Sequence, residues 1–257
     1  MASLVDLNAD MAEGFGAYDI GNDAELLKIV TSANVACGFH AGDASTMRRT
    51  VLLAKELGVG IGAHPGFNDL WGFGRRQIRM RAEELEYMIA YQIAALEGMA
   101  RYAGISVTHV KAHGALSNMA AVDESYAMAI GRAIKTINAN LIYVAQYGTQ
   151  LHRAAERLGL RVAREGYADR RYGDDGNLAP RSVPGTVLRD PAEAAAQALR
   201  LVQEGTAIAM SGKPVSIQVD TLCIHGDEPS AVDVAHAVRA GLTQAGVGVV
   251  PLSAMQL

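Results

Sequence analysis

Cysteine, long basic runs and long apolar runs are scarce in this sequence, and each shortage excludes a class of protein. Cys37 and Cys223 are the only cysteines in 257 residues, which excludes a disulfide-stapled secreted domain. The formal net charge is −4 and Lys and Arg do not cluster, so nucleic acid is not expected as a partner. The apolar segment 217–224 is interrupted by Gln218 and Asp220 and falls short of the roughly 20 residues that cross a bilayer. Since no charged start precedes an apolar signal core, we expect a cytoplasmic protein with no membrane segment.

Nucleotide-binding motifs are missing as well. Gly212-Lys213 is followed by Pro214, so it does not complete a P-loop, and no GxGxxG opens a helix after the first predicted strand. If the protein uses ATP, no known signature in this chain marks the site.

Composition and element order favour a single α/β domain over residues 1–257. Charged residues make up 19%, below the roughly 25% of an average soluble domain, and 50% are apolar, so we expect a large buried surface or a subunit interface. Strand-like and helix-like segments alternate without a Ser/Pro linker, which predicts a parallel barrel or open sheet. The predicted strands are 4–9, 33–37, 59–63, 105–112, 141–145, 160–165 and 215–225, with a weaker run at 247–252. The predicted helices are 22–31, 44–57, 81–103, 123–137, 148–158, 190–204 and 230–245, with an N-cap at Asp190 and terminal glycines at 58, 104, 159, 205 and 246.

Polar side chains interrupt the predicted strands at their carboxyl ends. Side chains alternate between faces of a strand, so Asn8 and Asp10 share a face, as do Lys111 and His113. In a parallel barrel such ends line the active site. Two irregular segments, 65–80 and 166–189, are expected to form loops over the mouth. The strand-end residues are Asn8, Asp10, Asn34, His40, His64, Lys111, His113, Glu165, His225 and Asp227.

These residues permit three interpretations. Asp10, His40 and His64 would give a metal three ligands and leave a position for water, although their spacing is not diagnostic. An acid-base site without metal would use His40 and His113 for proton transfer, with Lys111 binding a carboxylate or a developing oxyanion. Purely structural roles, such as an ion pair between Lys111 and Asp10, are the third interpretation.

Other reactive residues have simpler expected roles. His109 is expected to be a hydrogen-bonded core residue, and His152 and His236 are expected to be ordinary helix residues. Cys37 differs in strand parity from His40 and is expected to be buried rather than nucleophilic. The loop arginines Arg75, Arg76, Arg170, Arg171 and Arg181 either bind an anionic substrate or phosphate, or are solvated.

Several long blocks, together covering essentially the whole chain, resemble the LamB/YcsF family. They are Asp6-Leu-Asn-Ala-Asp10, Glu13-Gly-Phe-Gly16, 32–43, Gly62-Ala-His-Pro-Gly66, Gly72-Phe-Gly-Arg-Arg76, Lys111, His113-Gly-Ala-Leu116, Ala168-Asp-Arg170 and His225-Gly-Asp227. Ala12 and Ser117 stand where this family usually has Gly and Tyr, and no departure removes an Asp, Glu, Lys or His.

The resemblance implies a distorted (β/α) barrel of about seven strands, like glycoside hydrolases and deacetylases. It also implies ATP-dependent opening of the 5-oxoproline lactam to L-glutamate, performed with two companion subunits that share in ATP and Mg²⁺ binding. The alternatives are a metal-dependent carbohydrate N-deacetylase and a non-catalytic substrate-binding subunit.

We combine these interpretations into one expected site. The catalytic residues are Asp10, Glu13, His40, Lys111 and His113, and a divalent metal would use Asp10, His40 and His64. The expected substrate-binding residues are Asn8, Asn34, Asp43, Arg76, Glu165, Arg170, Arg181, His225 and Asp227.

Overall fold

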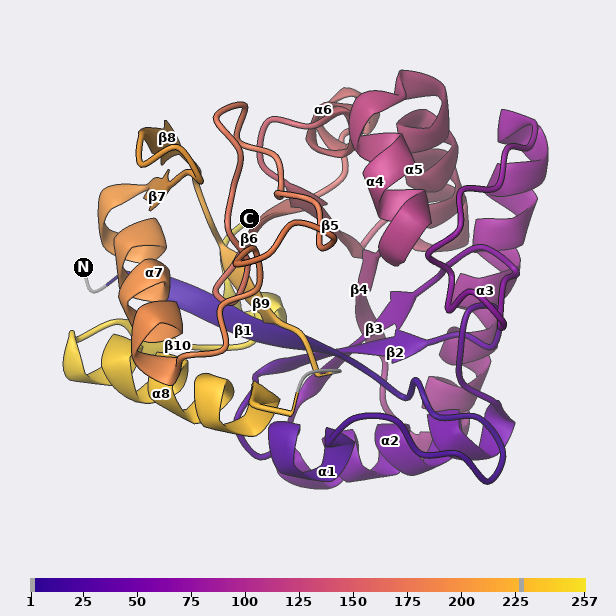
Figure 1. The fold of residues 1–257 in the computed structure, drawn as a ribbon. Helices are drawn as coiled ribbons and strands as arrows, with labels where there is room; N and C mark the ends of the chain where they lie inside the picture. Colours follow the sequence, from indigo (N-terminus) through magenta and orange to yellow (C-terminus); the bar gives the residue numbers. More distant parts are fainter. Residues whose placement is uncertain (1–2, 227–228) are drawn as a thin grey trace.

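Seven parallel strands close into a barrel in the computed structural model, which describes residues 3–226 and 229–257 (Figure 1). Each strand pairs with the next around the ring, and the last returns to the first through Asp6 opposite Thr221. The strand number expected from the resemblance is therefore confirmed. The ring consists of β1 (Leu4–Met11), β2 (Ser32–Ala36), β3 (Gly60–His64), β4 (Val107–Lys111), β5 (Ile142–Gln146), β6 (Val162–Tyr167) and β9 (Thr221–Ile224).

Helices cover the outside of this ring (Figure 1). The Asp43 side chain accepts hydrogen bonds from two amides at the start of α2, and Asp190 caps α7 with Pro191 in its first turn, as the sequence predicts. No helix in the described part of the chain has the length and apolar character needed to span a bilayer. The helices are α1 (Asp23–Leu26), α2 (Ala44–Leu57), α3 (Ala82–Ala103), α4 (Gly114–Val122), α5 (Glu124–Asn138), α6 (Gln150–Leu158), α7 (Pro191–Glu204) and α8 (Ala231–Gln244).

Three segments differ from the predicted elements. Segment 215–225 is not one strand, because β8 (Pro214–Ser216) pairs antiparallel with β7 (Thr206–Ile208) and the barrel strand β9 begins only after Asp220. The carboxylate of Asp220 instead accepts from the amide and guanidinium of Arg164. Helix α4 is absent from the predicted elements, since it begins with Gly and contains Ser and Asn, which are weak helix formers. The weak run 247–252 contributes only β10 (Gly248–Val249), which pairs with the start of β1.

The barrel interior is polar, which explains why the strands do not read as continuous apolar runs. Asn8 Nδ2 donates to Thr221 Oγ1 at 2.7 Å, and Asn34 Nδ2 donates to Asn8 Oδ1 at 2.7 Å. The His109 ring contacts Asn34 Oδ1 at 3.0 Å, as expected for a hydrogen-bonded core histidine. A Cβ at Gly62 would overlap this ring, so the glycine in β3 makes room for the imidazole from β4. These buried amides are satisfied by one another, which limits their desolvation cost.

Candidate active site

A cavity of about 540 Å³ opens at the carboxyl ends of the strands. Asp10 is the next-to-last residue of β1, His64 ends β3 and Lys111 ends β4, so three strand ends that are far apart in the sequence meet at one rim. Loop segment 166–189 contributes the opposite wall through Arg170 and Arg181. The expected convergence of polar strand ends is therefore present.

A lysine cluster, consisting of Asn8, Asp10, Lys111, Glu165 and Cys223, occupies one side of the rim. Lys111 Nζ lies 2.9 Å from Asp10 Oδ1 and 2.8 Å from Glu165 Oε1, and it also donates to Asn8 Oδ1 at 3.2 Å. Burial alone would lower the pKa of Lys111, but the charges of Asp10 and Glu165 hold that pKa well above its usual range. The ammonium is thus fixed and charged beside the cavity.

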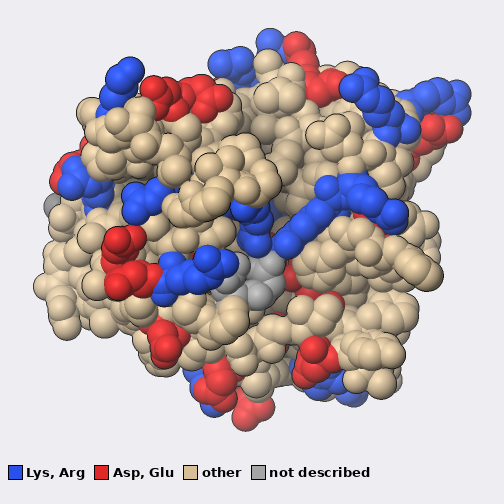
Figure 2. All heavy atoms as spheres, viewed as in Figure 1, with Lys and Arg blue, Asp and Glu red and all other residues tan. Residues whose placement is uncertain are grey.

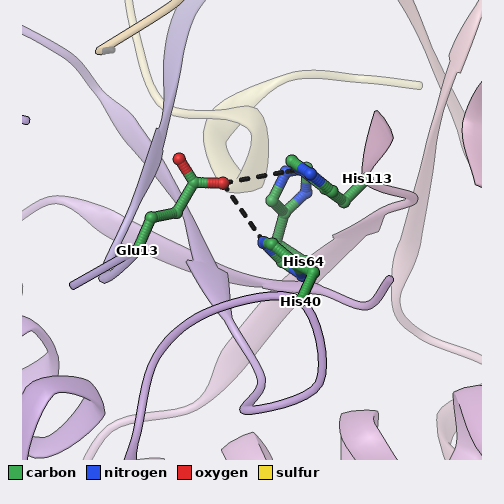
Figure 3. A group of neighbouring side chains, drawn as sticks. All are labelled: Glu13, His40, His64 and His113. Atoms are coloured by element: carbon green, nitrogen blue, oxygen red, sulfur yellow. Dashed lines mark hydrogen bonds and ion pairs between the residues drawn. The ribbon is translucent and has the colours of Figure 1, made fainter. Parts of the chain in front are cut away.

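A histidine cluster, consisting of Glu13, His40, His64 and His113, lies next to it (Figure 3). His40 Nε2 lies 3.2 Å from Glu13 Oε1, and His113 Nδ1 lies 3.4 Å from the same oxygen. The His40 and His113 rings stack at 3.7 Å between centroids. Burial lowers the pKa of His113 to about 3 and holds the pKa of His40 well below its usual value, so both rings are neutral at pH 7.

Two backbone carbonyls fix how the histidines are protonated. The Lys111 carbonyl lies 2.8 Å from His64 Nδ1 and the Phe73 carbonyl lies 2.8 Å from His113 Nε2, and a carbonyl can only accept. Each of these nitrogens therefore carries a hydrogen, which leaves His64 Nε2 and His113 Nδ1 as lone pairs in neutral rings. The two nitrogens face each other at 3.0 Å. Because facing lone pairs repel, a proton or metal ion taken up between these two nitrogens would stabilise the pair.

The geometry changes the ligand set expected for a metal. His40 and His64 come together with Glu13 and His113, and one ligand atom from each of the four lies within 4.8 Å of the others. Asp10 is not in this group, because its Oδ1 pairs with Lys111, and its Oδ2 is 3.4 Å from His64 Nε2. Asp10 belongs instead to a second group with metal-like spacing that contains Cys223 and His225.

The loop after β3 holds the histidine cluster in place. Phe73, whose carbonyl orients His113, has a φ of +54°, a conformation that a bulky residue rarely adopts. A Cβ at the next residue, Gly74, would lie 2.6 Å from His40 Cβ and 2.8 Å from His113 Cδ2, so this close approach requires glycine. Asp69 accepts from the Gly72 amide and pairs with Arg76, which closes the turn.

The other expected substrate-binding residues lie in different parts of the structure. Arg170, Arg181 and His225 line the cavity, whereas Arg76 pairs with Asp69 and exposes 67% of its side chain, leaving its neighbour Arg75 on the cavity wall. Asn34 lies inside the barrel, where it also donates to Asp10 at 3.0 Å. The Asp43 carboxylate caps α2 and also accepts a hydrogen bond from the Gly16 amide. These hydrogen bonds do not involve the lysine cluster or the histidine cluster. Asp227 lies outside the described residues.

Two residues beside the site were not among the expected set. Asp169 accepts from the His225 amide and contacts His225 Nδ1 at 2.9 Å, so it orients that ring toward the cavity. Tyr167 donates to Glu165 Oε2 at 2.8 Å and stacks on His225. The Ala168-Asp-Arg170 block contains Asp169, so the sequence held a signal for this residue.

The simpler expectations hold. Cys37 is buried, its thiol donates to the Val35 carbonyl, and burial raises its pKa to about 12, so it is not a ready nucleophile. His236 is exposed on α8, and His152 lies on α6 against Tyr147. Arg171 pairs with Glu193 at 3.2 Å.

Comparison with known proteins assigns the family. The 5-oxoprolinase A subunit of Rhodopseudomonas palustris (strain BisB18) is 52% identical over 98% of this chain and 99% of its own. The crystal structure of a lactam utilization protein from Thermus thermophilus superposes with a TM-score of 0.93 at 46% identity, covering 97% and 100% of the two chains. The catalytic domain of a peptidoglycan N-acetylglucosamine deacetylase from Eubacterium rectale shares the fold, with a TM-score of 0.55 at 12% identity over 100% of this chain and 91% of its own. The LamB/YcsF family model matches residues 5–257, and this chain belongs to the LamB/YcsF family.

Proposed function

We propose that this chain is the A subunit of an ATP-dependent 5-oxoprolinase and that it opens the lactam ring of 5-oxoproline to L-glutamate. The similarity along nearly the full length to a 5-oxoprolinase A subunit supports the substrate. The observation that carries the chemistry is a fixed ammonium and the neutral imidazole of His113 on the wall of one cavity, with the neutral imidazole of His40 stacked on that of His113. Such a set can hold an anionic substrate and accept a proton from water.

The reaction needs ATP because an unstrained five-membered lactam is a poor electrophile. Transfer of the γ-phosphoryl group to the lactam oxygen would give an imidate phosphate and ADP. Water then adds to the ring carbon, the carbon–nitrogen bond breaks as the nitrogen takes a proton, and an acyl phosphate remains. A second water releases phosphate and completes the new carboxylate, so two waters are consumed for each ATP and each lactam.

The clusters suggest how the work is divided among residues. His113 or His40 accepts the proton of the attacking water, because neutral imidazoles beside a carboxylate are suitable bases. Lys111 stabilises negative charge that develops on the substrate, and Asp10 keeps the ammonium in position. Glu13 orients His40, because its Oε1 lies 3.2 Å from His40 Nε2.

The histidine cluster is also suited to a divalent metal. The metal ion would be held by Glu13, His40, His64 and His113. The facing lone pairs of His64 and His113 can both ligate it, and backbone carbonyls contact the other nitrogen of each ring and fix its orientation. A metal bound there would lower the pKa of a water molecule.

Phosphoryl transfer is organised largely by two companion subunits in this proposal. The sequence has no P-loop, so the ATP and Mg²⁺ site is expected to be shared with or supplied by those subunits. The two cysteines are free thiols, which agrees with a cytoplasmic location.

Coupled 5-oxoproline hydrolysis, measured with and without the companion subunits, tests the proposal. We expect glutamate and ADP to form only when all subunits are present. Full coupled turnover by this chain alone would refute the division of labour, and no turnover by the complete set would refute the function.

The metal-like cluster and the shared fold keep the deacetylase as a second candidate function. It predicts ATP-independent release of acetate from an N-acetyl sugar by the metal-loaded chain. A non-catalytic subunit would instead bind 5-oxoproline and keep full turnover after replacement of His40 and His113.

A further inference from the structure

A buried carboxylate holds His225 at the cavity, and none of the proton and charge roles proposed above uses these two residues. Asp169 follows β6 and His225 follows β9, and these two strands pair with each other in the barrel. The side chain of Asp169 is 5% exposed and that of His225 is 13% exposed, and His225 lines the cavity. A buried carboxylate in contact with an imidazole at a cavity is an arrangement that enzymes use to move a proton.

The contacts between Asp169 and His225 fix where the ring carries its hydrogen. Asp169 Oδ2 accepts from the His225 backbone amide at 2.9 Å, and both carboxylate oxygens lie within 3.0 Å of His225 Nδ1. Burial alone would raise the pKa of Asp169, but His225 holds that pKa below its usual value, so the carboxylate can only accept. Nδ1 therefore carries a hydrogen. Nε2 makes no hydrogen bond within residues 3–226 and 229–257, which leaves it for a ligand in the cavity.

The surroundings of His225 fix the plane of its ring and already contain a cation. Tyr167 stacks on the ring with 5.7 Å between centroids and 17° between planes. His225 also belongs to the group with metal-like spacing that includes Asp10 and Cys223. The Lys111 ammonium lies 2.9 Å from Asp10 Oδ1 and donates to Cys223 Sγ at 3.0 Å. Since this ammonium supplies the positive charge of the group, the His225 ring is left to act on a substrate.

Other groups around the cavity are weak proton donors at neutral pH. Lys and Arg side chains gather around a hollow near the centre of the face in Figure 2, and a guanidinium keeps its protons. Burial alone would lower the pKa of Lys111, but Asp10 and Glu165 hold that pKa well above its usual range. The Tyr167 hydroxyl donates to Glu165 at 2.8 Å, and burial raises its pKa well above its usual value. His225 is therefore the better candidate for a proton donor.

We propose that His225 donates, through Nε2, the proton that the lactam nitrogen takes as the carbon–nitrogen bond breaks, and that Asp169 is its positioning residue. This assignment deepens the proposed function and rests on it. His113 follows β4, on the opposite side of the seven-strand ring from β9, so the group that accepts a proton from water and the group that donates to nitrogen are separate. A carboxylate in contact with the ring stabilises the imidazolium that gives up the proton.

Delivery of this proton decides the fate of the adduct that water forms with the imidate phosphate. The former lactam carbon of the adduct carries a hydroxyl group, the ring nitrogen and the phosphate oxygen. When the imidazolium protonates the nitrogen, the bonding pair leaves with nitrogen, the hydroxyl loses its proton to become a carbonyl, and the products are an amine and an acyl phosphate. Without that proton, phosphate is the better leaving group. The bonding pair then leaves with the phosphate oxygen, the lactam forms again, and ATP is hydrolysed without forming glutamate.

The ratio of glutamate to ADP formed by the complete set of subunits tests this assignment. The wild type should form both in equal amounts. Because loss of a proton donor slows its step about 10²- to 10⁴-fold, His225→Gln should lower the ratio about tenfold or more while ADP formation continues. His152→Gln is the matched control, since His152 lies 4.0 Å from a carboxylate, that of Glu156, and against Tyr147, but is not among the residues that line the cavity. Its ratio should match that of the wild type.

Water labelled with a heavy oxygen isotope gives a second readout, which a purely structural role would not change. When the adduct expels phosphate, the original lactam oxygen leaves with it, and the lactam that forms again contains oxygen from water. We expect label in the remaining 5-oxoproline with His225→Gln and very little with the wild type. Asp169→Asn keeps the imidazole but loses the acceptor that fixes its hydrogen, so it should also lower the ratio and introduce label. If His225→Gln fails to fold, as judged by circular dichroism, Asp169→Asn decides the assignment.

Three results would overturn the role of His225. They are an unchanged ratio in His225→Gln, a lower ratio without label in 5-oxoproline, and loss of ADP together with glutamate, since phosphoryl transfer comes before the nitrogen needs its proton. A normal ratio in Asp169→Asn beside a lower ratio in His225→Gln would overturn only the positioning role. Failure of the proposed function is distinct from all of these, because the wild-type set of subunits would then form no glutamate from 5-oxoproline.

Discussion

The lysine cluster and the histidine cluster lie side by side at one barrel rim, yet they balance charge differently. In the lysine cluster an ammonium lies within 3 Å of two carboxylates, so its cation is part of the chain. In the histidine cluster Glu13 faces imidazoles, and the lone pairs of His64 and His113 converge at 3.0 Å. The first cluster is complete as folded, whereas the second is completed by an added proton or metal. Loss of the Lys111 ammonium should therefore destabilise the fold, while the histidine cluster should respond to protons and metal ions in solution.

Removal of the Lys111 ammonium should have the largest effect on stability and turnover. Lys111→Met leaves Asp10 and Glu165 buried without their partner, so we expect coupled turnover to fall by orders of magnitude and stability to fall by about 3–5 kcal/mol. Urea unfolding and glutamate formation measure the two effects. Lys213→Met is the control, because Lys213 is exposed and lies 3.6 Å from Asp174. If Lys111→Met is as stable as Lys213→Met, the charge balance described for the lysine cluster is incorrect.

Replacement of an imidazole should impair chemistry more than folding. His113→Gln and His40→Gln are each expected to lower coupled turnover about 10²- to 10⁴-fold, the usual range for loss of a general base. The KM for 5-oxoproline should change much less than kcat. His236→Gln on the exposed face of α8 should retain full activity. Near-wild-type turnover in both cluster variants would favour a non-catalytic subunit.

Added divalent metal should distinguish the clusters directly. If the histidine cluster binds Zn²⁺ or Mn²⁺, an excess of the ion should raise the melting temperature by about 5 °C or more. His64→Gln should abolish the increase, while Asp10→Asn, outside this ligand set, should keep most of it. An equal increase in wild type and His64→Gln would show that the ion binds elsewhere, and the absence of any increase would show that the histidine cluster does not bind the ion.

Acid should destabilise the protein through its buried histidines. The pKa of His113 and that of His109 both fall from about 6.5 to about 3 on folding, chiefly through burial. The unfolded chain thus binds more protons between these values, so stability is full above pH 6.5 and decreases as the pH falls toward 3. Urea titrations followed by far-UV circular dichroism should show this slope, and His109→Gln should reduce it. Trp71 is 98% exposed and would report poorly on unfolding.

The smallest expected effect concerns the backbone beside Glu13. Ala12 has a φ of +59°, which lies in the left-handed region, and its amide donates to Asp23 at 2.7 Å. Ala12→Gly should relieve this strain and stabilise the chain by about 1 kcal/mol, with activity unchanged. Destabilisation on thermal melting would show that the conformation is not strained. Ala17→Gly, at an exposed position whose own φ is not positive, is the control.

The sequence predicted the strand ends well and the loops poorly, for a physical reason. The alternation of side chains along a strand fixes which face Asp10, Lys111 and Glu165 share, so their convergence at one rim could be anticipated. The position of a loop residue depends on contacts far along the chain. His113 was expected in an acid-base role but not as a metal ligand, because the turn at 69–76 that orients His113 has no periodic pattern.

The same limit explains the remaining differences. The split of segment 215–225 depends on the pairing of Asp220 with Arg164, more than 50 residues earlier, which no local window reveals. The choice of Arg75 rather than Arg76 for the cavity wall is decided by Asp69, which binds the latter.

The space that Gly62 leaves for the His109 ring links two adjoining strands. Any side chain at position 62 would compete with the imidazole for one volume, and a smaller residue at position 109 would leave Asn34 with an open amide oxygen. A substitution at either position is therefore tolerated only with a compensating change at the other, so the two strands pack as one unit.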